Sequence, residues 1–184
     1  MNRVVYVFVI FLCVSCSTKD QDAQNTSVSI PVFASIDQSV KTQITGFLTD
    51  YFALNKTLIE DNLDAAKVAS ASFATTANSF NIEKLSPEQL DFYLVQSSNL
   101  KDGLKNLGDS KDIEAARAEL ATISEAMYAM VKAFHPNDSP LYYQYCPMAR
   151  DNKGANWLSA TKEVVNPYMG QMMLACGRTQ ETIE

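Results

Sequence analysis

Apolar side chains recur every three or four positions in four stretches of the chain, and this spacing places them on one face of a helix. The stretches cover residues 40–58, 61–80, 86–108 and 109–134. Short polar segments separate them, and short connections favour antiparallel neighbours in a bundle. The sequence therefore predicts an all-α fold built on an antiparallel four-helix bundle.

Capping residues mark the ends of these stretches. Asp61 is a suitable N-cap for the second helix, and Ser86 begins the third, where Gln89 completes a capping box. Gly108 stops the third helix, and the fourth then opens at residues 109–110. His135 and the proline after it close the fourth helix, which gives His135 a capping role.

Beyond residue 136 the helical pattern gives way to a C-terminal extension rich in aromatic and turn residues. Residues 141–145 are typical of a short aromatic strand, and residues 171–175 could pair with it. We therefore expect a small β-hairpin or an irregular loop here. The pairing of these two segments would bring Cys146 and Cys176 close together.

The first residues are typical of an export signal. Arg3 precedes an apolar run over residues 4–14 that is too short to span a bilayer, which needs about 20 residues. A small residue then precedes Cys16, as in bacterial lipoprotein signals, so Cys16 is the candidate lipidation site; the alternative is a plain cleaved signal with Cys16 as a chance neighbour.

The chain thus divides into three parts: a lipoprotein signal peptide over residues 1–15, a flexible polar linker over 16–36, and a helical domain over 37–184 that ends in a Cys/Met segment. We expect an exported protein that a lipid anchors to the membrane of the cell envelope. A periplasmic or outer-membrane-associated location fits this expectation.

Composition narrows the possible functions. The chain has 184 residues, of which 47% are hydrophobic, and this is enough for one packed domain. With 15 basic and 21 acidic residues the net charge is -6, which argues against nucleic acid as a partner. One histidine and no recognisable nucleophile, phosphate loop or paired-carboxylate motif favour a binding protein over an enzyme.

Four short motifs lie in the C-terminal segment: Cys-Pro-Met-Ala at 146–149, Gly-Ala-x-Trp-Leu-Ser at 154–159, Asn-Pro-Tyr-x-Gly at 166–170 and Met-Leu-x-Cys-Gly at 173–177. With these motifs the chain resembles a bacterial exported domain of unknown function, the DUF3347 type. Such domains occur alone or appended to CusB-like adaptors of copper and silver efflux. The resemblance extends over roughly residues 40 to 184 and implies a metal-efflux context.

Thiolate and thioether sulfur atoms are soft ligands that select Cu(I) or Ag(I) over harder ions. Cys146 and Met148 lie two residues apart, which in an extended segment places both side chains on one face. The candidate metal ligands are Cys146, Met148, Met173 and Cys176, with Met172 and His135 as further candidates.

A disulfide between Cys146 and Cys176 is the competing interpretation, since exported proteins commonly oxidise such pairs, and free buried thiols are a third alternative. It would close a loop of about 30 residues and contribute roughly 3 to 4 kcal/mol to stability. The sequence thus supports two functions. One is a lipid-anchored protein that handles copper or silver, with an efflux adaptor or another envelope protein as partner. The other is a metal-free adaptor module stapled by the disulfide.

Overall fold

The computed structural model describes Met1 and residues 29–184 of the chain. The predicted signal peptide, Cys16 and most of the predicted linker lie outside the described residues. Within the described part, no helix is long and apolar enough to cross a membrane.

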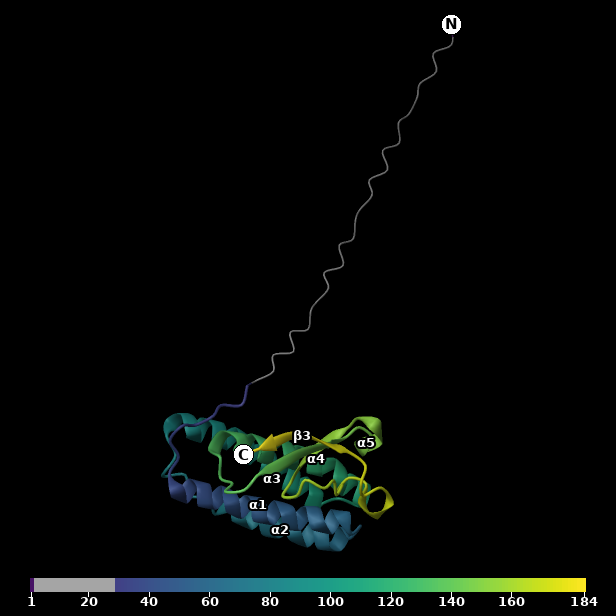
Figure 1. The fold of residues 1–184 in the computed structure, drawn as a ribbon, viewed down its shortest axis with the longest axis horizontal. Helices are drawn as coiled ribbons and strands as arrows, with labels where there is room; N and C mark the ends of the chain where they lie inside the picture. Colours follow the sequence, from purple (N-terminus) through teal and green to yellow (C-terminus); the bar gives the residue numbers. More distant parts are fainter. Residues whose placement is uncertain (2–28) are drawn as a thin grey trace.

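Four long helices make up most of the described chain: α1 (Gln38–Ile59), α2 (Leu63–Asn78), α3 (Pro87–Gly108) and α4 (Ile113–Phe134). Consecutive helices pack against each other, and α1 also packs against α4. Figure 1 shows the helices lying lengthwise beside one another. The four stretches that the apolar spacing predicted are therefore confirmed as helices.

The helix ends agree with the sequence in part. At α3 the capping box is present, with the Ser86 side chain and the Gln89 side chain each accepting a hydrogen bond from the other residue's backbone N–H. The N-cap of α2, however, is Asn62, which accepts from the N–H of Ala65 at 3.0 Å. Asp61 does not cap this helix because its backbone is left-handed, with φ 56°, and its carboxylate binds another part of the protein. The cap of α4 is Asp112, a little later than expected.

Helix α4 lies at the centre of the core because it packs on α1, on α3 and on the sheet. Thirteen of its 22 residues are buried, so its apolar surface extends well around the helix. Alanines at many of these positions allow close approach of the neighbouring elements. Leu120 is completely buried, and Leu104 on α3 is only 1% exposed.

Replacing Leu104 or Leu120 by Ala should lower the free energy of unfolding by about 2 to 5 kcal/mol, because each change leaves a cavity in the core. Chemical denaturation followed by circular dichroism measures this quantity. Leu94→Ala is the matched control on α3, since Leu94 is 52% exposed and should tolerate the change. Losses below about 1 kcal/mol at both buried positions would contradict the packing described.

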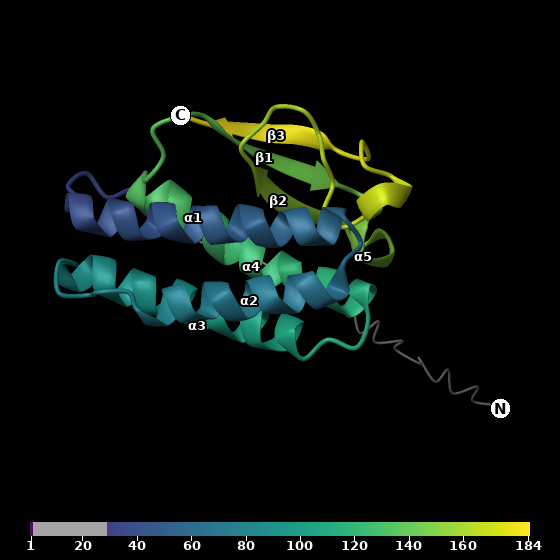
Figure 2. The same ribbon diagram turned by 90° about the horizontal axis from the view of Figure 1, so that it is seen from below.

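A three-stranded antiparallel sheet follows the helices, with β1 (Leu141–Cys146) between β2 (Ala155–Ser159) and β3 (Arg178–Ile183). A short element, α5 (Ala149–Asn152), and a 3-10 turn, η1 (Gly170–Met172), lie in the connections. Figure 2 shows the sheet on one side of α1 and α4, with α2 and α3 on the other side. The chain is thus mostly helical with a small sheet at its C-terminal end.

The predicted strand over 141–145 is confirmed, but its predicted partner over 171–175 is wrong. Gly170 has φ 52°, which is incompatible with an extended strand, and the backbone turns there into η1. The two real partners were harder to recognise. β2 is short and buried, and β3 is an edge strand of mostly polar residues that lacks an apolar face.

Residues 30–36, which the sequence assigned to the linker, pack against the core through Ile30, Phe33 and Ile36. The backbone N–H of Phe33 donates to the carbonyl of Ala133 at 3.0 Å, and its ring lies 5.2 Å from that of Phe134. The packed domain therefore begins a few residues before α1.

Candidate functional site

The sheet brings the two described cysteines together. Cys146 is the last residue of β1, and Cys176 lies just before β3, whose Arg178 is opposite Tyr145 in the antiparallel register. Their Sγ atoms are 2.9 Å apart, and neither forms a disulfide in the structure. Cys146 is fully buried and Cys176 is partly exposed. The pair is therefore accessible to solvent on the side of Cys176.

The neighbouring thiol affects the protonation of Cys176. The hydrogen bond with Cys146 raises the pKa of the Cys176 thiol, and burial and the charge that Cys146 would carry raise it further. The Cys176 thiol therefore favours its protonated form when nothing else is bound. A cation bound by both sulfur atoms has to displace protons, so its binding should strengthen as the pH rises.

Methionine side chains gather at the same end of the molecule. Met148 follows Cys146 by two residues and is 44% exposed, and Met172 is 75% exposed. Both line one surface cavity of about 250 Å³, together with Met169, a residue outside the predicted ligand set. The carbonyl of Met173 accepts from the N–H of Cys176 at 3.0 Å. Exposed thioethers thus lie in the segments that flank the two cysteines in the chain.

His135 lies elsewhere. It ends α4 in a left-handed conformation, as the predicted cap, and its N–H donates to the carbonyl of Val131 at 3.0 Å. It precedes the start of β1, whereas Cys146 ends that strand, and six strand residues span roughly 20 Å. We therefore leave His135 out of the proposed ligand set. Across the described residues, no group of three or more His, Cys, Asp or Glu side chains could hold a metal ion, so thioethers have to complete a site.

A strained turn separates Met148 from β2. Arg150, Asp151 and Asn152 all have left-handed backbone conformations, with φ between 55° and 65°. Such a conformation costs about 1 to 2 kcal/mol for each residue with a side chain. Hydrogen bonding partly offsets this cost, because the N–H of Gly154 donates to the carbonyl of Ala149 at 3.0 Å. The turn borders the methionine cavity and so fixes one of its walls.

Asn166 holds the loop that carries Cys176. Its side-chain oxygen accepts from the N–H groups of Tyr168, at 2.8 Å, and Met169, at 3.2 Å. Its side-chain nitrogen donates to the carbonyl of Cys176 at 2.6 Å, and its backbone N–H donates to that of Leu174. The Asn-Pro-Tyr-x-Gly motif therefore positions the second cysteine.

A buried polar network joins this loop to the helices. The hydroxyl of Tyr51 lies 2.7 Å from that of Ser124 and accepts from the N–H of Leu158. The hydroxyl of Tyr168 also reaches Ser124 and donates to the carbonyl of Asn156. Burial raises the pKa of both Tyr51 and Tyr168, so both hydroxyls stay protonated and can donate.

Arg117 is a second connection, which the helical pattern did not reveal because that pattern located apolar positions only. Its side chain is 5% exposed and forms an ion pair with Asp61 and another with Glu114. It also donates to the carbonyls of Leu58, at 2.9 Å, and Pro167, at 3.1 Å. The sequence did contain a signal for this buried position. Arg117 lies four residues after Ile113 and three before Leu120, within the apolar stripe of α4.

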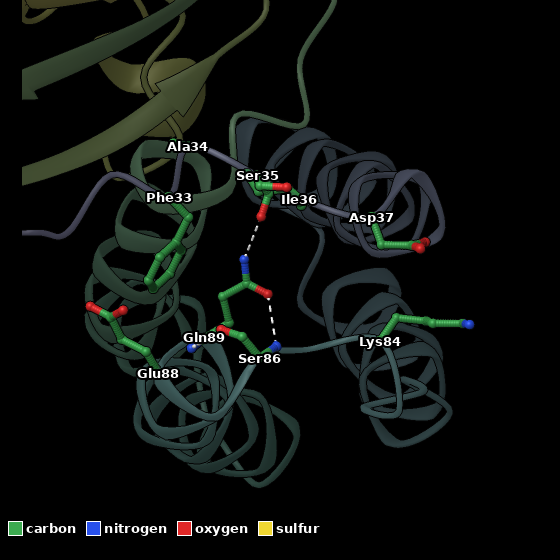
Figure 3. A pocket seen from close by; sticks show the side chains of 9 residues that line it. All are labelled: Phe33, Ala34, Ser35, Ile36, Asp37, Lys84, Ser86, Glu88 and Gln89. Carbon is green, nitrogen blue, oxygen red and sulfur yellow. Dashed lines mark hydrogen bonds between the residues drawn. The ribbon is translucent and has the colours of Figure 1, made fainter.

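A cavity of about 550 Å³ lies at the opposite end of the helices. Figure 3 shows the Gln89 side chain spanning it, with bonds to the carbonyl of Ser35 and the N–H of Ser86. Its charged lining residues, Asp37, Lys84 and Glu88, are of mixed sign. This cavity marks where the chain enters the domain and brings no chemically reactive groups together.

These features define a small helical domain whose C-terminal sheet brings two thiols together, with exposed methionines in the adjoining loops. Residues 47–139 match a family described as "Protein of unknown function (DUF3347)", and the chain belongs to this family. The match covers the later part of α1 and the whole of α2, α3 and α4, whereas the four short motifs lie beyond its end. No curated protein and no solved structure matches the chain.

Proposed function

We propose that this protein binds soft monovalent metal ions, Cu(I) or Ag(I), in the cell envelope and acts in metal efflux or tolerance. The observation that carries the proposal is the contact between the Cys146 and Cys176 sulfur atoms, from segments 30 residues apart. Thioethers of Met148, Met172 and Met173 lie in the same part of the chain, and each is at least 37% exposed.

The chemistry of these groups suits such ions. Two thiolates supply strong soft ligands, and thioethers add weaker ones without adding charge. Cys146 would bind from the protein interior and Cys176 from its open side. The methionines would approach from the surface, where an incoming ion or a partner protein can reach them. The role is that of a binding protein rather than an enzyme.

The location follows from the first 36 residues of the sequence. An apolar signal, Cys16 as lipid acceptor and a polar linker would hold the domain near a membrane of the envelope. The partner in this proposal is an efflux adaptor or another envelope protein. We also propose that the four helices form an up-down antiparallel bundle, because their connections are short.

A second candidate function is a metal-free adaptor whose C-terminal loop is stapled by a Cys146–Cys176 disulfide. The contact between the two sulfur atoms also favours this candidate. Forming the bond removes two protons and two electrons from the thiols, and an oxidising compartment supplies the acceptor. The bundle surface would then dock the partner.

A metal titration separates the two candidates. The reduced full-length protein should bind about one Cu(I) and prefer it clearly over Zn(II), since soft sulfur ligands favour the softer ion. Competition with a chromogenic Cu(I) chelator at several pH values measures this affinity, which should rise with pH. No uptake by fully reduced protein, or equal affinity for both metals, would reject the metal-binding function.

A further inference from the structure

Of the two sulfur atoms that meet at the end of the sheet, only one belongs to a strand residue. Cys146 ends β1, where it is fully buried and pairs with Ala155 of β2. Cys176 lies in the loop before β3 and is partly exposed. The sheet therefore fixes the position of Cys146, and the 2.9 Å contact between the two Sγ atoms depends on how firmly the loop holds Cys176.

Three contacts hold the backbone at Cys176. Its N–H donates to the carbonyl of Met173 at 3.0 Å, within the same loop. Its carbonyl accepts from the side-chain nitrogen of Asn166 at 2.6 Å. The next residue, Gly177, passes so close to β1 that a Cβ atom there would lie 2.8 Å from the carbonyl oxygen of Tyr145, and its φ of 141° also favours glycine. Cys176 is thus held on both sides along the chain.

Asn166 is itself held firmly in place. It is completely buried, and its backbone N–H donates to the carbonyl of Leu174 at 2.8 Å. Its side-chain oxygen accepts from the N–H groups of Tyr168 and Met169. Two donors face this oxygen and a carbonyl faces the nitrogen, so only one orientation of the amide satisfies all three partners. The oxygen therefore shapes the turn after Asn166, and the nitrogen holds Cys176.

We propose that Asn166, supported by Gly177, is a positioning residue that sets how readily Cys146 and Cys176 form a disulfide. Oxidation joins the two Sγ atoms and passes two electrons and two protons to an external disulfide, which is thereby reduced to two thiols. The equilibrium constant of this exchange measures how well the fold holds the two thiols in contact. The consequence for metal rests on the proposed function: because oxidation removes both thiolate ligands, Asn166 also sets the fraction of the protein that can bind metal.

Exchange of the metal-free full-length protein with reduced and oxidised glutathione measures this equilibrium. Mass spectrometry after proteolysis counts the linked peptides that contain Cys146 and Cys176, so Cys13 and Cys16 do not enter the measurement. Asn166→Asp keeps an oxygen that accepts from the two N–H groups but loses the donor to the Cys176 carbonyl. Its equilibrium constant for disulfide formation should fall about ten-fold, equivalent to about 30 mV for a two-electron couple. Because no metal is present, this outcome is separate from whether the reduced wild type takes up Cu(I).

Two further variants separate positioning from stability, which chemical denaturation measures for each. Gly177→Ala should lower the equilibrium constant in the same direction, because its Cβ displaces the backbone next to Cys176. Ser70→Ala is the control: the buried Ser70 hydroxyl donates to the carbonyl of Leu104 at 2.6 Å, so its loss lowers stability far from the thiols and should leave the constant unchanged. An unchanged constant in folded Asn166→Asp, or in Gly177→Ala if Asn166→Asp does not fold, or an equal fall in Ser70→Ala, would overturn the proposal.

Discussion

Replacing Arg117 by Met should lower the free energy of unfolding by about 3 kcal/mol, because the change removes hydrogen bonds to buried carbonyl groups. Arg117 donates to the backbone of Leu58 and Pro167 and pairs with Asp61. These contacts join the end of α1 to the loop that precedes Cys176. Arg117→Lys should also destabilise the protein, since a lysine cannot reproduce the forked geometry of the guanidinium group.

Chemical denaturation measures the effect, and Lys105→Met is its matched control. Lys105 also forms an ion pair on a helix, with Asp109, but both side chains are at least 70% exposed. Exposed pairs contribute little, so this variant should unfold like the wild type. If Arg117→Met shows the same small change as Lys105→Met, Arg117 does not connect the two parts of the fold.

Gly170 offers an independent check on the same contact. A Cβ atom at this position would collide with the side chains of Asp61 and Arg117, and its φ of 52° disfavours any side chain. Gly170→Ala should therefore destabilise the protein, whereas Gly46→Ala should be tolerated, because a Cβ at Gly46 meets nothing within 4 Å. Chemical denaturation compares the two variants, and equal stability would mean that the space around Gly170 is not tightly filled.

Replacing either cysteine by serine should abolish tight Cu(I) binding, because each thiolate supplies a strong soft ligand. Met148→Leu and Met173→Leu should weaken binding by about ten-fold, which corresponds to about 1.4 kcal/mol, and preserve the fold. His135→Gln is the control and should matter least, since β1 separates His135 from the pair. Chelator competition on the reduced proteins gives these affinities.

The Cys146→Ser, Cys176→Ser double variant is the strictest member of this series. Unchanged Cu(I) affinity in this variant, with its helical content intact by circular dichroism, would exclude the thiol pair as the metal site. Loss of binding in His135→Gln alone would mean that the ligand set has been placed at the wrong end of β1.

The helices could be predicted from the sequence because their signals are local. Apolar spacing located all four, and Ser86 with Gln89 fixed the start of α3. The sheet partners could not be predicted in this way, because their pairing depends on contacts far apart in the chain. β3 has no apolar face of its own, and Gly170 adopts its turn where Asp61 and Arg117 lie against it.

The proximity of Cys146 and Cys176 was expected for a reason that was only partly correct. The expected hairpin does not exist, yet β3 begins just after Cys176 and pairs with β1, so the two cysteines still meet. The role of Arg117 depends on partners from distant elements. A single sequence shows the residue type at such positions but not the neighbour that gives it a role.

Metal content and free thiols, measured together on the full-length protein isolated without reductant from cells grown with copper, test the proposed metal-binding function most directly. We expect about one copper for each chain, with both Cys146 and Cys176 protected from thiol reagents until the metal is removed. A copper-free protein with an intact Cys146–Cys176 disulfide that takes up no Cu(I) even after full reduction would contradict this function.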